Sequence, residues 1–347
     1  MLMREKLLPL VNALLSPERP ASSLFQEVNA LLDLLESLGQ LPLLPDQDIS
    51  KGETQTVHGL ALSPHAAALC AKDFVRTVQF MRGAYQAVCA QYLKNSARPV
   101  TLLYVGCGPY AFLVLPLMLS LKPQQVQIRL IDIHVKSIDS VMRIAEHLGL
   151  QPYIAEITTI DAAHYQIESA QKPDIILLEV MQANLEKEPQ LALSRHMMQQ
   201  APDALLIPEQ IRVSLCLLDM DEELSTQSSN DQVNSLEHRR FDLGSILCVD
   251  RQSIHTWETI EGRHLPAARL QIPSEVPRGY SPMLLTTITV YQNILLNTYD
   301  SGLTCPRRFN ADFSAGDYLN FTYQLGANPK LTVEVEPMFT STNNYHD

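Results

Sequence analysis

Residues 100–110 read VTLLYVGCGPY, and this stretch decides the fold. Six mostly apolar residues predict a buried strand, and a tight turn with Gly106 and Gly108 follows at once. Downstream, further strand-like runs alternate with helical runs. Such alternation predicts an α/β fold with a doubly wound parallel sheet. The other strands are expected at 126–133, 153–161, 174–179 and 204–208, and the helices between them at 111–121, 135–149 and 191–202.

The chain on either side of this sheet has a different character. Apolar residues at helical spacing between 24 and 38 predict an N-terminal helical region. Residues 64–94 predict a long helix or a kinked pair, with Ser63 as N-cap and Pro64 in the first turn. From Glu209 the pattern becomes β-rich, which predicts a barrel-like or sandwich-like domain. We expect an N-terminal helical extension (1–55), a Rossmann-like domain (56–208) and a β-rich domain for substrate binding or dimerisation (209–347).

Composition limits the classes of function. The 347 residues carry a formal net charge of −12, and so acidic a chain does not favour nucleic-acid binding, which needs a basic surface. No run approaches the roughly 20 apolar residues of a membrane span, and no signal-peptide cleavage site follows the first apolar run. The six cysteines are scattered, and neither they nor the histidines show metal-ligand spacing. We expect a cytoplasmic protein without a metal site and without a membrane partner.

The glycine turn predicts a nucleotide-like ligand. Gly106 and Gly108 stand where a backbone without Cβ atoms can approach a ligand at the carboxyl edge of the sheet. Asp132 ends the next strand, where a carboxylate can bind both hydroxyls of a ribose, and Asp161 ends the third strand, within reach of an adenine edge. No third glycine follows in register, so S-adenosylmethionine fits this turn better than NAD does. An ordinary strand-to-helix turn is the alternative.

Residues 174–188, DIILLEVMQANLEKE, run a buried strand directly into Glu179, and Glu188 follows nine positions later. A strand of a doubly wound sheet delivers its last residue to the edge where ligands bind. If the loop returns Glu188 to the same place, the two carboxylates can each accept paired hydrogen bonds from one guanidinium. The alternative is a strand-end glutamate followed by a solvated helix start. Glu186 is expected on the surface in either case.

Taken together, these motifs resemble those of the class I methyltransferases and, more narrowly, the protein arginine methyltransferases, over about residues 58–215. The resemblance implies S-adenosyl-L-methionine as cofactor and Arg76 as a ligand of the cofactor's carboxylate. It implies Glu179 and Glu188 as the catalytic pair that clamps an acceptor guanidinium. It also implies a homodimer, with residues 221–240 as a candidate arm. The segments that carry it are DFVRT (73–77), YVGCGPY (104–110) with Asp132, LEVMQANLEKE (178–188) and LIPEQIRV (206–213).

The chain departs from the family pattern in three places. Residues 180–183 read VMQA, and only the methionine agrees with the family's tryptophan, methionine, glycine and tyrosine. His255 and Trp257 resemble a Thr-His-Trp segment of the family in composition but not in order, so a surface role for His255 is favoured. Residues 1–55 have no counterpart and could cap the active site, which would suit a small acceptor better than a protein tail.

We therefore predict an S-adenosylmethionine-dependent N-methyltransferase that acts on the guanidino group of a small molecule, such as free arginine or a derivative. Two other methyltransferases stay open: one that modifies arginine in proteins, and one that acts on a metabolite without a guanidino group. The altered glutamate loop also leaves open a catalytically silent, cofactor-binding scaffold. The glycine pattern disfavours a dehydrogenase.

Overall fold

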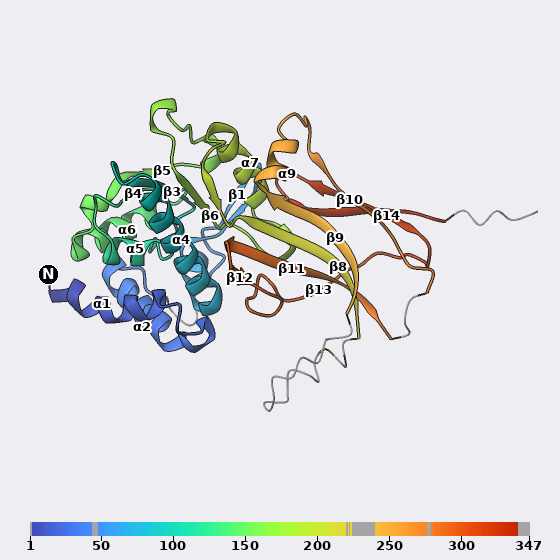
Figure 1. Ribbon diagram of the computed structural model, residues 1–347, viewed down its shortest axis with the longest axis horizontal. Coiled ribbons are helices and arrows are strands. Elements are labelled where there is room, and N and C mark those ends of the chain that lie inside the picture. Colours follow the sequence, from blue (N-terminus) through green and yellow to red (C-terminus); the bar gives the residue numbers. More distant parts are fainter. Residues whose placement is uncertain are drawn as a thin grey trace, which may run out of the picture.

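The computed structural model describes residues 2–43, 48–219, 221, 223, 240–275 and 279–338. Figure 1 shows a half built of helices and a parallel sheet, which carries the N-terminus, beside a half built of antiparallel strands. The chain enters the second half just after Ile207 and Pro208, which are joined by a cis peptide bond.

The first half is organised around a five-stranded parallel sheet in the order β5-β4-β3-β6-β7. The chain starts at the central strand β3, runs outward to β5, and then returns to β6 on the other side. The strand order therefore reverses between β3 and β6, and ligands of open α/β sheets bind at the carboxyl ends of strands at such a point. The strands are β3 (Val100–Val105), β4 (Val126–Asp132), β5 (Ile154–Thr159), β6 (Ile175–Leu178) and β7 (Leu205–Ile207).

The sheet is buried because helices cover it, and all four residues of β6 are apolar and buried. Residues 64–94 form the kinked pair, and the Ser63 side chain accepts a hydrogen bond from the Ala66 N–H as the predicted N-cap. The helix predicted at 111–121 begins only at Leu115, because Ala111 has a φ of 45° and cannot continue a right-handed helix. The helices are α3 (Pro64–Leu69), α4 (Phe74–Lys94), α5 (Leu115–Ser120), α6 (Val135–Leu148) and α7 (Gln190–Gln200), with 3₁₀ turns η2 (Cys70–Lys72), η3 (Gln151–Tyr153), η4 (Ala162–His164), η5 (Ser169–Gln171) and η6 (Ala183–Leu185).

The N-terminal region consists of α1 (Leu2–Leu15), η1 (Ala21–Ser23) and α2 (Phe25–Gly39), which pack against α4, α5 and α6. Leu31, Leu32 and Leu35 of α2 are buried and belong to the same apolar core as the sheet. A hairpin of β1 (Thr54–Thr56) and β2 (Gly59–Ala61) follows. The hairpin crosses the domain boundary predicted at residue 55, and the predicted domain limits stay a prediction.

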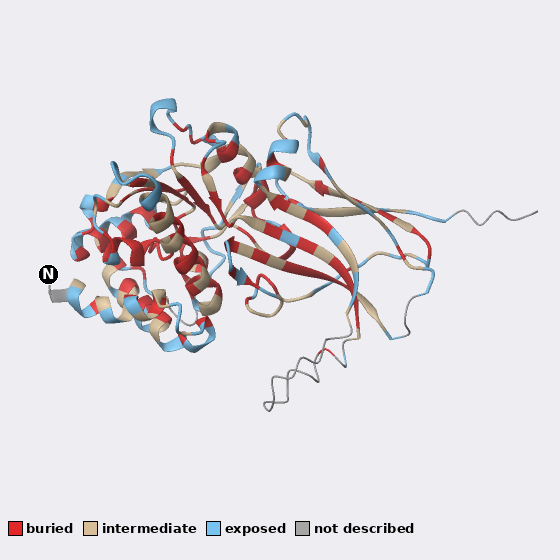
Figure 2. Cartoon of the chain, viewed as in Figure 1, coloured by how far each residue is buried: buried red, intermediate tan, exposed pale blue. Residues whose placement is uncertain are grey.

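The second half contains two antiparallel sheets, of order β12-β11-β8-β9 with β13 beside β11, and β10-β14-β15. Buried residues alternate along strands such as β14, as Figure 2 shows for this half in red and tan. The elements are β8 (Gln210–Leu218), β9 (Phe241–Asp250), α9 (Arg251–Thr256), β10 (His264–Gln271), β11 (Ser281–Tyr291), β12 (Ile294–Leu296), β13 (Arg307–Arg308), β14 (Tyr318–Gln324) and β15 (Lys330–Glu336).

The predicted fold class is confirmed: a doubly wound parallel sheet lies between an N-terminal helical region and a C-terminal β-rich domain. Most of the candidate arm at 221–240 lies outside the described residues, so the arm and the homodimer stay predictions. Among the helices of the described ranges, none has the length and apolar character to cross a membrane.

Candidate active site

A cavity opens at the carboxyl ends of β3 and β6, where the strand order reverses, and it encloses about 1130 Å³, part of it open to solvent. The structure brings every candidate site residue to its lining, although each residue's role stays a prediction. These residues are Arg76, Gly106, Gly108, Asp132, Asp161, Glu179 and Glu188.

The glycine turn and Asp132 form one unit at the base of the cavity. Gly106 and Gly108 have φ values of 69° and 62°, in the left-handed region that favours glycine. The Gly108 N–H donates to Asp132 Oδ2 at 2.9 Å, and the His134 N–H donates to Asp132 Oδ1 at 2.8 Å. These bonds hold the carboxylate in one orientation, and each oxygen keeps a lone pair for a ligand hydroxyl.

Asp161 lies just after β5, next to the end of β4 that carries Asp132. Its Oδ1 accepts a hydrogen bond from the Ala163 N–H at 3.0 Å, so the side chain caps the short η4 turn. The side chain is partly buried and lines the cavity. Its Oδ2 lies 3.7 Å from Nδ1 of the exposed His164. The position agrees with a ligand at the end of β5, but capping alone also explains an aspartate here.

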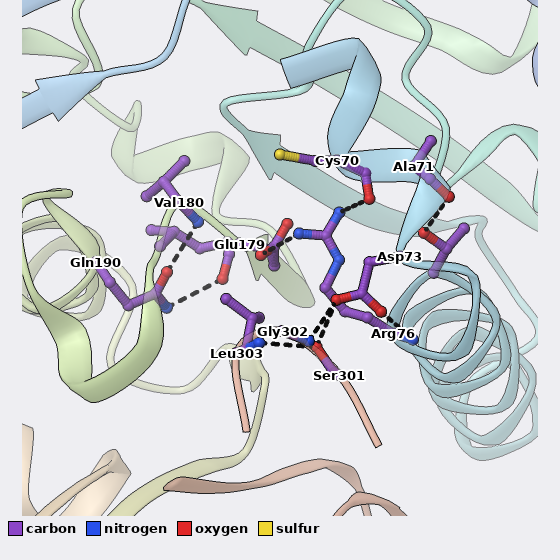
Figure 3. A network of polar contacts seen from close by, with 12 residues as sticks. Cys70, Ala71, Asp73, Arg76, Glu179, Val180, Gln190, Ser301, Gly302 and Leu303 are labelled. Atoms are coloured by element: carbon purple, nitrogen blue, oxygen red, sulfur yellow. Dashed lines mark hydrogen bonds and ion pairs between the residues drawn. The ribbon is translucent and has the colours of Figure 1, made fainter. Parts of the chain in front are cut away.

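Glu179 and Arg76 form a buried ion pair, which Figure 3 shows with its neighbours. Arg76 Nη1 donates to Glu179 Oε1 at 3.0 Å, and Nη2 donates to the Cys70 carbonyl oxygen at 2.9 Å. The two side chains are 7% and 8% exposed. Arg76, predicted to bind the cofactor, thus contacts Glu179, predicted to bind the acceptor. Pairing with a nearby acidic residue would also explain a buried arginine at position 76 if no ligand bound there.

The base of α4 is fixed by the β-rich domain. Asp73 caps α4 by accepting from the Arg76 N–H, and its Oδ2 also accepts from the Ser301 hydroxyl at 2.7 Å and the Gly302 N–H at 2.9 Å. The network in Figure 3 therefore joins Arg76, Glu179 and the loop after β12. The β-rich domain supports the position of Arg76 in this way.

Glu188 is only 5% exposed although it follows the exposed Glu186 and Lys187. Burial and the charge of Glu179 raise the pKa of Glu188 to about 8. Burial also raises the pKa of Glu179 to about 7, against the opposing effect of Arg76. Burial lowers the pKa of the Arg76 guanidinium, but the surrounding groups, with Glu179 first among them, together outweigh burial, and the net shift is upward. A bound cation would therefore stabilise the ionised forms of Glu179 and Glu188.

The loop between the two glutamates has an unusual backbone that the β-rich domain holds. Asn184, Leu185 and Lys187 have φ values of 59°, 60° and 64°, a conformation that non-glycine residues rarely adopt. Thr286 of β11 hydrogen-bonds the Asn184 backbone and side chain at 3.3 and 3.1 Å, and the Tyr323 hydroxyl donates to the Leu185 carbonyl at 2.5 Å. These contacts direct Glu188 back into the cavity.

The β1–β2 hairpin covers the loop and was not predicted from the sequence. The Leu60 N–H donates to the Lys187 carbonyl at 2.8 Å, and Gln55 Nε2 donates to the Ala327 carbonyl of the β-rich domain at 2.7 Å. The Thr54 hydroxyl lies 3.1 Å from His134 Nε2. The hairpin thus spans the glutamate loop, the β-rich domain and the segment after Asp132, and Thr56, His58 and Leu60 line the cavity.

Two other sequence expectations have clear outcomes. His255 is 80% exposed, pairs with Glu258 at 3.2 Å between Nδ1 and Oε2, and does not line the cavity. Glu186 is exposed, as expected. Among the lining residues that sequence reasoning missed, those with titratable side chains include His58, His134, Cys70 and Tyr104. Of these four, only Tyr104 and His134 could have been found from the sequence. Tyr104 lies two residues before the first glycine of the turn, and His134 lies two residues after Asp132.

The hairpin can be tested at Gly59, which has a φ of 146°. A Cβ there would lie 2.8 Å from the Lys187 carbonyl oxygen and 2.9 Å from the Pro189 nitrogen. We expect Gly59→Ala to lower the free energy of unfolding by about 2–5 kcal/mol, from backbone strain and overpacking together. Urea denaturation measures the loss.

The matched control is Gly262→Ala, because Gly262 has a φ of 99° but a Cβ there meets no atom within 4 Å. Backbone strain alone should lower its stability by about 1–3 kcal/mol. Equal losses in the two variants would contradict tight packing of the hairpin on the glutamate loop.

Comparisons with known proteins give similarity of fold only. No family model matches the chain, and a search of curated proteins finds no match. Among solved structures, the Trypanosoma brucei PRMT1 enzyme-prozyme heterotetrameric complex with AdoHcy is 15% identical over 78% of this chain and 92% of that chain, with a TM-score of 0.49. Arabidopsis thaliana protein arginine methyltransferase 10, in a uniquely open conformation, is 14% identical over 77% and 92%, also with a TM-score of 0.49. Similarity of this degree does not assign an activity, which must be inferred from the residues of the cavity.

Proposed function

We propose that this protein is an S-adenosylmethionine-dependent N-methyltransferase that acts on the guanidino group of a small molecule, such as free arginine or a derivative. One observation carries the proposal: two buried carboxylates, Glu179 and Glu188, line the same cavity as the Gly106–Gly108 turn and Asp132. A doubly wound sheet alone supports many chemistries, so the function has to rest on this combination.

The described residues suit the cofactor in three respects. The turn at Gly106 and Gly108 lines the cavity, and its Gly108 N–H fixes the Asp132 carboxylate, which can accept hydrogen bonds from ribose hydroxyls. Arg76 has five N–H groups, of which two contact Glu179 and Cys70. Its buried Nε–H has no hydrogen-bond partner among the described residues, so donors remain for a carboxylate.

When bound, S-adenosylmethionine supplies an electrophilic methyl group on a positively charged sulfur. A guanidino nitrogen of the acceptor would form the new C–N bond with its lone pair while the C–S bond breaks and its electrons stay on sulfur. Glu179 and Glu188 would hold the other N–H groups of the guanidinium and so aim the attacking nitrogen. Their negative charge would also stabilise the positive charge that the acceptor gains in the transition state.

The same carboxylates can handle the released proton. A bound guanidinium favours the ionised form of both side chains, because opposite charges lower a carboxyl pKa. After methylation the nitrogen must lose one proton. Glu188 is the better placed base of the two, because Glu179 already forms an ion pair with Arg76.

Enclosure of the pair favours a small acceptor over a protein tail. Glu188 is buried next to the hairpin that contacts Lys187 and Ala327, and the buried Glu179 is paired with Arg76. A polypeptide acceptor needs an open groove on both sides of the reacting side chain. The described residues present the two carboxylates within a cavity instead.

The experiment that tests the proposal is methyl transfer from labelled S-adenosylmethionine to a panel of free guanidino acids, arginine-containing peptides and simple amines. We expect transfer to one or more free guanidino acids. Transfer to peptides alone would overturn the small acceptor but keep the guanidinium clamp, and transfer to amines alone would overturn the clamp. Cofactor binding without transfer to any acceptor, unchanged by Glu179→Gln, would indicate a silent scaffold.

Stability should fall as pH rises, because Glu188 binds a proton more tightly in the folded chain than in the unfolded one. Its pKa is about 8 when folded, against 4.5 as its ordinary value. This contribution is complete below about pH 4.5 and is lost as pH rises through about 8, with a total change on the order of 5 kcal/mol. The charged groups that act on it are Glu179, Arg76 and Glu53.

Urea denaturation of the ligand-free protein at a series of pH values measures this dependence. The Glu188→Gln variant cannot titrate at this position, so its stability should fall less steeply than that of the wild type between pH 5 and 8. Parallel curves for the two proteins would show that Glu188 has an ordinary pKa and is not buried as described.

A further inference from the structure

Gln190, the first residue of α7, encloses the backbone on both sides of Glu179. Its side-chain Oε1 accepts a hydrogen bond from the Val180 N–H, and its Nε2 donates to the Leu178 carbonyl oxygen, both at 3.0 Å. Gln190 is 1% exposed, and it does not line the cavity. Figure 3 shows its amide facing the two peptide groups that flank the glutamate.

This amide takes the place of a missing strand residue. The pairing of β6 with β3 ends at Leu178, opposite Val105, and the pairing with β7 ends at Leu177, opposite Ile207. Glu179 therefore lies just beyond both ladders. In a parallel sheet, one residue donates to the carbonyl before its partner and accepts from the N–H after it, and the Gln190 amide makes this same pair of bonds around Glu179.

We propose that Gln190 is a positioning residue that fixes the direction of the Glu179 carboxylate for methyl transfer, an inference that rests on the proposed function. Arg76 holds only one carboxylate oxygen, and it does so from the far end of a long side chain. The backbone of Glu179 leads directly into the loop with left-handed residues, where no ladder restrains it. The Gln190 amide supplies that restraint.

The same side chain also sets the spacing of the two carboxylates. Gln190 is two residues after Glu188, and its amide is bonded to the start of the loop at Leu178 and Val180. The loop from 179 to 190 is thus closed at its base, next to both glutamates. A shift of this base would move Glu179 relative to Glu188, and a misplacement of about 1 Å can reduce a rate on the order of 100-fold.

The test replaces Gln190 by methionine, which has a similar length but neither hydrogen bond. We expect Gln190→Met to reduce kcat roughly 10–100-fold in the methyl transfer found with the acceptor panel, with a smaller change in KM. The dissociation constant for S-adenosylhomocysteine, measured by calorimetry, should stay within about threefold of wild type. In the same variant, hydrogen exchange of the Val180 amide should become faster.

Gln200 at the other end of α7 is a matched control. Its Oε1 accepts from the Ile167 N–H at 2.8 Å and its Nε2 donates to the Tyr165 carbonyl at 3.2 Å. The side chain thus makes a similar pair of hydrogen bonds on either side of one residue, and none of these three residues lines the cavity. Gln200→Met should keep kcat and should lose less stability than Gln190→Met, because Gln200 is only partly buried. A kcat in Gln190→Met no lower than in Gln200→Met would overturn the positioning role while leaving the proposed function intact.

A second measurement does not depend on activity or on the variant's folding. In the wild-type protein the Val180 amide should exchange as slowly as amides of β6, because Gln190 covers it. Fast exchange at Val180 in the wild type would overturn the inference even if methyl transfer is found. If no acceptor is methylated, the proposed function is overturned. The exchange rate of the Val180 amide would still show whether Gln190 makes its two hydrogen bonds around Glu179.

Discussion

Replacing Glu188 by glutamine is expected to reduce kcat/KM for the guanidino acceptor about 100-fold or more. The cationic acceptor would lose one of its two buried carboxylate partners, which costs about 2–5 kcal/mol. Each 1.4 kcal/mol corresponds to roughly a tenfold decrease in kcat/KM. The side chain has the same shape, and Glu188 is enclosed at 5% exposure, so the fold should be retained. Steady-state kinetics with the acceptor found in the panel measure the effect.

The control for this variant is Glu186→Gln, which removes an exposed carboxylate two residues away in the same loop. It should leave kcat/KM within about threefold, because exposed charges interact weakly with the site. S-adenosylhomocysteine should bind to both variants as it does to the wild type. Equal activities for the two variants would contradict a role of Glu188 in holding the acceptor.

Replacing Arg76 by methionine is expected to destabilise the protein by about 3–5 kcal/mol above pH 7. Glu179 is 8% exposed, and the variant would leave its charge buried with no nearby cation in the described site. The loss should shrink toward pH 5, because Glu179 has a pKa of about 7 with Arg76 present and would take up a proton more readily without it. Denaturation at the two pH values measures both effects.

Arg98→Met gives the matched control for this loss. Arg98 forms a two-bond pair with Asp174 at 2.7 and 2.6 Å, but its side chain is 52% exposed. Its removal should lower stability by no more than about 1 kcal/mol. Similar losses for Arg76→Met and Arg98→Met would contradict the burial of the Arg76–Glu179 pair.

The sheet and the sites at its edge were predictable because the controlling signals are local. Strands that carry near-continuous apolar runs are read from the sequence directly, and a parallel sheet places the residues at the carboxyl end of each strand at one edge. Gly106, Asp132, Asp161 and Glu179 follow this rule, and all four line the cavity. The return of Glu188 to the same cavity was not local, and it was inferred from the family resemblance.

Other parts depend on contacts between distant residues, which one sequence does not reveal. The hairpin strands are three residues each, and their stability comes from bonds to Lys187 and Ala327. The Arg76–Glu179 pair joins residues 103 positions apart. Gln190 reads as an ordinary polar residue at a helix start, and its role follows only from its place beside β6.

Binding of a guanidinium by the two buried carboxylates is tested most directly by equilibrium titration. Free guanidino acids of different chain length, each with its neutral ureido counterpart, are titrated by calorimetry into the protein saturated with S-adenosylhomocysteine. We expect at least one guanidino acid to bind, and its ureido counterpart to bind about 100-fold more weakly because it brings no charge to Glu179 and Glu188. Equal affinity for the two members of every pair, or no binding by any guanidino acid, would contradict a guanidinium site at Glu179 and Glu188.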